Sequence, residues 1–387
     1  MKIRVGFFLF LAISLIFASC AKKTNIILPG ENAEDISSET VKSHQWFCFT
    51  ENGFEEIDLP QNASGLLKKP WTEAIRISSA ANIPSKEYAR SGIADAYAIV
   101  NRLGVLTLDG GNVRLYQDKS IFSGETADSL VFSGAHPVFC LYRNTFFNEG
   151  FSVTYEALQQ SRPFLVQFNP ETKMSYPLVS YANLNLKDDE EISGFFWDGK
   201  SWACSIKNQS EDFVQFNYLS WSPIVNLSDL SPALNKDLFV FEEISESQYR
   251  ALNTPRLFKD TPGQLKKLLS SIPQSMCVYV IYRDESGTSP KSYYQEGNGG
   301  RSLNAKAIIA PAASLVAAVF EDGTTYVKNT ESDELHAFRL PKLPGAYKYG
   351  EVCISKKTML VSWEETDFYK SGRSGFIKVD LESLLGI

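Results

Sequence analysis

The chain alternates short apolar runs with turn-forming residues from about Gln45 to its C-terminal end. The runs are four to six residues long, and Gly, Asp, Asn, Ser or Pro separates one from the next. This length and spacing are typical of β-strands, whereas helices need about ten residues or more. The expected strands are Trp46–Phe49, Ala74–Ser78, Ala96–Val100, Val105–Leu108, Val113–Tyr116, Val138–Tyr142, Phe164–Phe168, Ile192–Trp197, Trp202–Ile206, Phe213–Tyr218, Val278–Tyr282, Ala307–Ala310, Leu315–Phe320, Thr325–Lys328, Leu335–Leu340, Val352–Ser355, Met359–Trp363 and Phe376–Val379.

Composition agrees with a large sheet protein. The chain has 26 Phe, 17 Tyr and 6 Trp, and aromatic side chains suit the pleated, half-buried surface of a sheet. Hydrophobic residues make up 44% and charged residues 21%, which is enough apolar material for a core. We therefore expect an all-β fold.

Three hairpins are predicted at Asp109-Gly110, Asp198-Gly199 and Asp322-Gly323, because each Asp-Gly pair lies between two apolar runs. Asp-Gly readily adopts the positive φ angles of a tight hairpin turn. The spacings between the three pairs are near multiples of the ~40–45 residues of a four-stranded propeller blade. We read the hairpins as marks of a weak repeat.

The chain length favours a β-propeller of about seven blades, and six or eight also fit. Propellers often close by pairing the first strand with the last, which predicts that Gln45–Phe49 pairs with Phe376–Asp380. A sandwich or another large β fold is the alternative.

One stretch breaks the strand pattern. Ser245-Glu-Ser-Gln248 is a capping box and predicts a helix over Glu246–Leu252. A second helix is predicted after Thr261-Pro-Gly-Gln264, where leucines recur at helical spacing until Pro273. We expect a helical-hairpin insert over residues 243–273, which either covers a sheet edge or serves as a partner-binding arm.

The N-terminus has the pattern of an export signal. Lys2 and Arg4 precede an almost wholly apolar run, Val5–Phe17, and two small residues then lead to Cys20. The apolar run is too short for a good membrane-spanning helix.

Cys20 at this position resembles the lipobox of bacterial lipoproteins. In that family the thiol receives a diacylglycerol and the new amino terminus a further acyl chain. Phe17 stands where the strict pattern has Leu, and such relaxed boxes are similar to those of spirochaetes. The resemblance implies a signal peptide over 1–19, a lipidated Cys20 with a flexible tether over 20–43, and a propeller body over 44–387. An ordinary secretory signal is the alternative.

Five further cysteines, Cys48, Cys140, Cys204, Cys277 and Cys353, are far apart, and most lie in apolar stretches. We expect core packing for most of them, since a free Cys behaves as a small hydrophobic residue. Their number is odd, so at least one stays unpaired if the others form disulfides.

The sequence predicts neither a metal site nor a cofactor. Its three histidines show no ligand spacing, and it has no G-x-S-x-G motif. The net charge of −7 without a basic block disfavours nucleic acid as a partner. We therefore expect a protein that is not an enzyme.

Aromatic and arginine residues near expected loops are the candidates for a binding face, because such residues dominate interface hot spots. They also occur in cores, so a purely structural role competes at each position. The candidates are Arg143, Trp197, Arg283, Trp363 and Arg373. The polar loop Tyr369–Gly375, between the last two expected strands, is the favoured functional loop.

The leading hypothesis is a lipid-anchored binding or scaffold protein of the cell envelope, which faces the periplasm or the cell surface from the cell membrane or the outer membrane. Its partner would be an envelope protein or a glycan. One alternative is a carbohydrate-active enzyme that uses carboxylates. Another is an accessory lipoprotein in outer-membrane protein assembly, which the chain resembles only in gross plan because it lacks the repeat motifs of that group.

Overall fold

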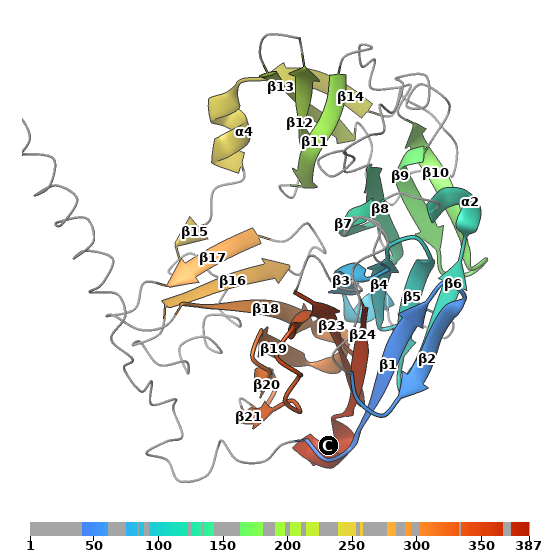
Figure 1. The fold of residues 1–387 in the computed structure, drawn as a ribbon, viewed down its shortest axis with the longest axis vertical. Coiled ribbons are helices and arrows are strands. Elements are labelled where there is room, and N and C mark those ends of the chain that lie inside the picture. The colour runs from blue at the N-terminus through green and yellow to red at the C-terminus, as the bar shows by residue number, and fades with distance from the viewer. Residues whose placement is uncertain are drawn as a thin grey trace, which may run out of the picture.

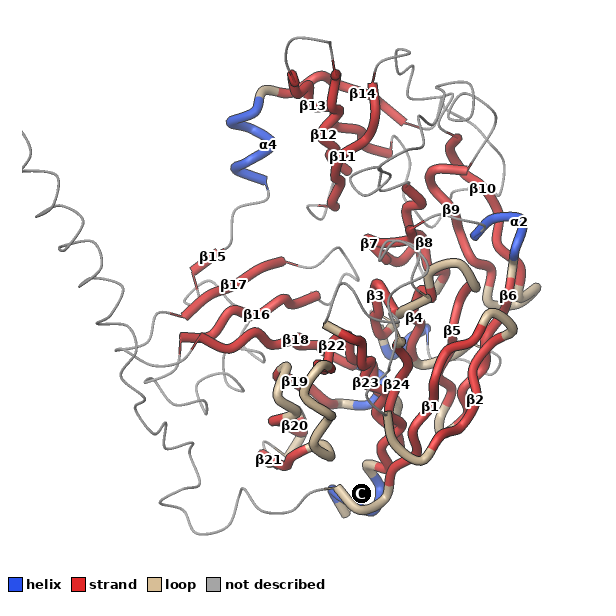
Figure 2. Tube along the Cα trace, viewed as in Figure 1, coloured by secondary structure: helices blue, strands red, loops and turns tan. Residues whose placement is uncertain are grey.

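The computed structural model describes residues 41–60, 75–83, 85–88, 93–122, 126–133, 135–142, 163–180, 190–197, 202–209, 214–223, 239–252, 256–257, 277–283, 291–295, 302–332, 334–366 and 373–386. Strands dominate these residues, and the helices are few and short (Figure 2). The helices are α2 (Lys119–Phe122), α4 (Glu246–Leu252) and α6 (Glu382–Leu385), with 3₁₀ turns η3 (Lys86–Tyr88) and η9 (Pro311–Ala313). No helix in this part of the chain is long and apolar enough to cross a membrane.

The described strands form five sheets. From one edge to the other, the first sheet, which we call the closing sheet, contains β2 (Gly53–Ile57), β1 (His44–Thr50), β24 (Ser374–Asp380), β23 (Thr358–Glu365) and β22 (Tyr347–Ile354). In the same edge-to-edge order, the second sheet contains β3 (Ile77–Asn82), β4 (Ala96–Val100), β5 (Gly104–Asp109) and β6 (Asn112–Gln117). The third contains β10 (Met174–Ser180), β9 (Pro163–Asn169), β8 (His136–Tyr142) and β7 (Thr126–Ser133). The fourth contains β11 (Glu190–Trp197), β12 (Trp202–Gln209), β13 (Val214–Pro223) and β14 (Phe239–Ile244). The fifth contains β15 (Arg256–Leu257), β17 (Lys291–Gln295), β16 (Cys277–Arg283), β18 (Ser302–Ala310), β19 (Leu315–Phe320), β20 (Thr324–Asn329) and β21 (Leu335–Arg339).

The sheets follow one another around the molecule in chain order (Figure 1). Neighbouring strands are antiparallel in four sheets, while the fifth also has two parallel pairs, β15 with β17 and β16 with β18. Four strands carry the main contacts between sheets: β22 lies against both β18 and β3, and β3 lies against β7. The mostly β architecture is therefore confirmed, and each expected strand overlaps an observed one.

The expected pairing of the first strand with the last is also confirmed. β1 runs antiparallel to β24 from His44 opposite Val379 to Cys48 opposite Gly375. Just before β1, the carbonyl of Ser43 accepts a hydrogen bond from the Asp380 amide at 3.1 Å. The two ends of the described chain thus meet in one sheet.

The strands on either side of each Asp-Gly pair form an antiparallel hairpin as predicted, but the hairpins do not mark a repeat. Asp109-Gly110 joins the third and fourth strands of its sheet, and Asp322-Gly323 joins β19 to β20. β11 and β12, the first two strands of another sheet, pair on either side of Asp198-Gly199. The repeat interpretation is wrong, because a tight turn suits any antiparallel pair and says nothing of its position within a sheet.

The capping box acts as expected. The Ser245 hydroxyl accepts the Gln248 amide at 3.3 Å, the Gln248 side chain accepts the Ser245 amide at 2.8 Å, and α4 follows. α4 lies against β12 and β13, with the Tyr218 and Tyr249 ring centroids 4.9 Å apart. The helical-hairpin interpretation of 243–273 is wrong for Arg256–Leu257, which pairs with β17 as a strand. Residues 258–276, with the second predicted helix, lie outside the described residues.

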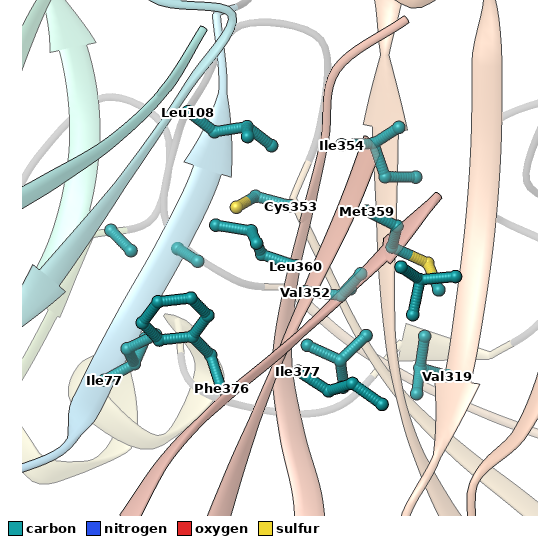
Figure 3. Close-up of a cluster of buried hydrophobic side chains, with 14 of the residues drawn as sticks. Ile77, Leu108, Val319, Val352, Cys353, Ile354, Met359, Leu360, Phe376 and Ile377 are labelled. Carbon is teal, nitrogen blue, oxygen red and sulfur yellow. The ribbon is translucent and has the colours of Figure 1, made fainter. Parts of the chain in front are cut away.

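The largest core cluster joins the closing sheet to its two neighbours (Figure 3). Ile77 and Leu108 come from one neighbour, Val319 from the other, and Leu360 and Ile377 from the closing sheet itself. Cys48 and Cys353 belong to this cluster, and Cys204 is buried elsewhere. None of the three forms a disulfide and all are buried, so core packing is confirmed for them, while the side chains of Cys140 and Cys277 lie outside the structural description.

A buried asparagine links two sheets where β3 and β22 end. Asn82, at the end of β3, is 5% exposed. Its Oδ1 accepts the amide of Ile354 at 3.0 Å, and its Nδ2 donates to the carbonyls of Ile354 and Asp95. One side chain therefore satisfies both backbone groups of the last residue of β22.

We expect Asn82→Ala to lower the free energy of unfolding by about 2–4 kcal/mol, because it leaves buried amide and carbonyl groups without partners. Urea denaturation followed by tryptophan fluorescence measures the change. The control is Asn52→Ala, at an exposed position in the β1–β2 turn, which should cost less than about 0.5 kcal/mol. Equal midpoints for the two variants would contradict a structural role for the Asn82 side chain.

Candidate functional site

The favoured loop is flanked by a cluster of charged residues at one end of the closing sheet. We call Arg76, Lys348, Glu364, Glu365 and Arg373 the hairpin-end cluster. β23 ends at Glu365, and the Glu365 amide donates to the Arg373 carbonyl at 3.0 Å just before β24 begins. Loop residues 367–372 lie outside the described residues.

Glu364 connects three elements on one face of the sheet. Its Oε2 lies 3.4 Å from Arg76 Nη1, just before β3, and its Oε1 lies 3.4 Å from Lys348 Nζ on β22. The Lys348 side chain is 40% exposed, and those of Arg76 and Glu364 about half as much. Two cations thus share one carboxylate, and these three side chains carry one net positive charge. The Lys348–Glu364 pair is the more exposed of the two, and such a pair contributes little to stability.

Trp363 and Glu365 occupy the opposite face, because successive side chains of a strand alternate. They are 1% and 2% exposed. The indole of Trp363 meets Tyr347 edge-on at 5.4 Å between centroids and Trp46 at 6.5 Å. These rings form a rigid apolar layer behind the charged end of the sheet.

Arg373 belongs to the same face of the sheet as Trp363. Trp363 pairs with Gly375, and Arg373 precedes Gly375 by two residues, which is the period of side chains on one face of a strand. Arg373 Nη2 lies 3.9 Å from the sulfur of Cys48. Burial raises the pKa of the Cys48 thiol, and the charge and hydrogen bond of Arg373 only partly oppose the shift. Cys48 is therefore a protonated thiol at neutral pH and not an activated nucleophile.

Glycine is required at position 375. A Cβ there would overlap the carbonyl oxygen of Phe47 on β1 and would lie 2.7 Å from Cζ2 of Trp363. Gly375 therefore lets β1, β24 and the Trp363 ring approach one another closely.

The structure brings together two of the five candidate binding residues, Trp363 and Arg373. Trp363 is a core residue that supports the site from behind, while Arg373 is partly exposed beside it. Arg143 lies outside the described residues, as does the expected lipid-attachment residue Cys20. Trp197 and Arg283 end β11 and β16, but their side chains are not described.

Sequence reasoning missed Arg76, Lys348 and Glu364. The acidic pair Glu364-Glu365, at the end of an apolar run, was a weak signal for a charged strand end. No local pattern points to Arg76, which is 288 residues away from Glu364 in the chain.

The carboxylates of this cluster do not have the arrangement of a glycosidase. A pair of acids must face each other across a substrate, whereas Glu364 and Glu365 project from opposite faces of β23. No group of three or more His, Cys, Asp or Glu among the described residues could hold a metal ion. The arrangement suits ion pairing and hydrogen bonding with a partner.

A carboxyl with a raised pKa lies at the other end of the sheets. Burial raises the pKa of Asp95, although its hydrogen bond from the Gly110 amide, at 3.1 Å, acts in the opposite direction. A raised carboxyl pKa can mark a catalytic acid. Here the hydrogen bond ties the β3–β4 connection to the β5–β6 turn, which gives Asp95 a structural role.

Comparison with known sequences gives a family and a lipoprotein relative. A sequence model described as "Family of unknown function (DUF8086)" matches residues 35–383. An uncharacterized lipoprotein of Treponema pallidum (strain Nichols) is 26% identical over 366 residues, covering 82% of this chain and 81% of the relative. The resemblance to spirochaetal lipoproteins is thereby confirmed.

Two solved structures illustrate the structural comparison. Sqt1 of Saccharomyces cerevisiae matches with a TM-score of 0.31 and 8% identity, over 83% of this chain and all of its own. The β-propeller domain of Nup133 from Vanderwaltozyma polyspora matches with a TM-score of 0.25 and 8% identity, over 84% and 73%. Likeness at this level carries no argument about function.

Proposed function

The chain belongs to the family of unknown function DUF8086, and from this premise we propose that it is a lipid-anchored envelope protein that binds a partner without catalysis. The anchor is an acylated Cys20, exposed by cleavage after Ser19. The lipobox-like sequence and the lipoprotein relative both support this assignment. The body is a β-propeller, and the binding site is the hairpin-end cluster.

Three observations support the propeller. Most sheets are four-stranded and antiparallel. Sheets that follow one another in the chain contact each other, as β3 contacts β7 and β18 contacts β22. The first described strand of the chain, β1, pairs with the last, β24. The parallel pair of β16 and β18 divides the fifth sheet into two units. The described residues then contribute six units, within the range expected from chain length.

The observation that carries the proposed function is that the chain enters the closing sheet at the end opposite the cluster. The chain enters β1 beside Asp380, whereas the cluster surrounds the other end of β23 and β24. A strand of seven residues, such as β1, spans roughly 23 Å. A partner can therefore reach the cluster while the protein stays on its membrane.

The charge of the cluster selects the partner. Arg76 and Lys348 outnumber Glu364 on one face of the sheet end, and Arg373 adds a partly exposed guanidinium on the other face. Arginine also binds carboxylates in a planar, two-point geometry. We propose that the partner is an envelope protein that presents acidic side chains to these cations.

We expect Lys348→Ala combined with Arg373→Ala to reduce recovery of the partner at least tenfold when the lipidated protein is purified from solubilised envelope. The loss follows from removing one partly exposed cation from each face of the cluster. The charge-matched control is Lys86→Ala combined with Lys357→Ala, two exposed ion-paired lysines at the opposite end. Equal recovery from both variants would contradict the site, and cleavage of an envelope glycan by the wild-type protein would favour the enzyme alternative.

A further inference from the structure

The strand that follows the tether is also the strand that closes the body. β1 buries Trp46, Cys48 and Phe49 in the core. The Trp46 ring stacks on Tyr349 at 6.4 Å between centroids and meets Trp363, so β1 covers aromatic side chains of β22 and β23. Only non-covalent contacts join β1 to β24, because the two strands come from opposite ends of the chain and Cys48, the cysteine of β1, forms no disulfide.

β1 is attached to the rest of the closing sheet on one side only. On its other side lies β2, which is the edge strand and is joined to β1 by a short turn. The β1–β2 hairpin can therefore leave as a unit and keep its own pairing. Five residue pairs with β24 hold it in the sheet, together with the Phe47 ring stacked on Phe376, the contact of Arg373 with Cys48, and a hydrogen bond of 2.7 Å from the Gln117 side chain to the Asn52 carbonyl.

Load on the tether reaches these pairs one at a time. It first meets the Ser43 carbonyl bound to the Asp380 amide and the Val41 amide bound to the Arg339 carbonyl, both at 3.1 Å. Because β1 and β24 are antiparallel, the tether and the end of β24 leave from the same end of the sheet. Tension between them opens the His44–Val379 pair first and the Cys48–Gly375 pair last. The inner strand β23, by contrast, has a paired neighbour on each side.

We propose that the β1–β2 hairpin is a latch that tension on the anchor opens before any other described strand separates. Opening detaches β1 from β24 and uncovers Tyr349 and Trp363. The source of the tension rests on the proposed lipid anchor, whereas the latch is a property of the folded body. The two can therefore be tested separately.

The test pulls single molecules of the mature chain, residues 20–387 without lipid, between handles at the N-terminus and the C-terminus. We expect a reversible first step of at least about 25 Å, the length of the seven residues of β1, at a lower force than unfolding of the remainder. A disulfide from Gln45→Cys and Lys378→Cys, which are register partners in β1 and β24, should abolish this step until a reductant is added.

The matched control is a disulfide from Lys328→Cys and Leu335→Cys, which joins β20 to β21 and should leave the first step unchanged. Persistence of the step in the oxidised Gln45→Cys/Lys378→Cys protein would overturn the latch, as would unfolding of the wild-type body in a single event. Neither result depends on lipidation, which is tested separately by labelling of Cys20 with palmitate.

Discussion

Gly375→Ala is expected to lower the free energy of unfolding by about 4 kcal/mol or more, a large part of the 5–15 kcal/mol that stabilises a typical protein. The added methyl group would overlap the Phe47 carbonyl oxygen on β1 and press on the Trp363 ring. Neither obstacle can move freely, because Phe47 is paired in the sheet and Trp363 is 1% exposed. Relief requires β1 to separate from β24.

Urea denaturation monitored by tryptophan fluorescence measures this effect, since Trp46 and Trp363 both lie in the closing sheet. The matched control is Gly345→Ala, because a Cβ at Gly345 would meet no atom within 4 Å and its φ is not positive. The control should change the free energy of unfolding by less than about 0.5 kcal/mol. If Gly375→Ala is as stable as Gly345→Ala, β1 accommodates the methyl group, and β1 and β24 are packed less tightly than their register implies.

Cys20→Ala is expected to transfer the protein almost completely from the detergent phase to the aqueous phase in a detergent partition, and to abolish incorporation of radiolabelled palmitate. The thiol is the proposed attachment point of the diacylglycerol. Each buried CH₂ of an acyl chain contributes about 0.8 kcal/mol to membrane binding, so loss of the chains removes the anchor.

The control for this prediction is Cys48→Ala, which removes a buried thiol within the closing sheet and should leave both labelling and partition unchanged. Palmitate that still enters the Cys20→Ala protein would disprove lipidation at this residue. That outcome would revive the alternative of an ordinary secretory signal.

Much of the secondary structure was predictable from local pattern. Every expected strand overlaps an observed strand, and the helix after Ser245 has its expected bounds. The overlooked strands are β2, β7, β10, β14, β15 and β17. All but β17 are edge strands, and β17 lies beside the two-residue edge strand β15. A terminal strand has one paired neighbour and tolerates polar residues and Pro, such as Pro177 in β10, so it lacks the apolar run that identifies a central strand.

The candidate site was only partly predictable. Trp363 and Arg373 were candidates because aromatic and arginine residues flank the last expected hairpin. Arg76 and Lys348 join them only through Glu364, which lies 288 residues from Arg76. Ion pairs between such distant segments follow from sheet packing, which no window of sequence reports.

The sequence by itself therefore determined the local features of this protein: the strands with apolar runs, the tight turns at Asp-Gly and the helix cap at Ser245. These features depend on residues a few positions apart, whose backbone preferences act before any tertiary contact forms. The tertiary structure alone decided where each hairpin lies within its sheet, why position 375 must be glycine, and which charges meet at the end of β23. Those properties depend on contacts between segments that are far apart in the chain, and such contacts are defined only once the sheets have packed together.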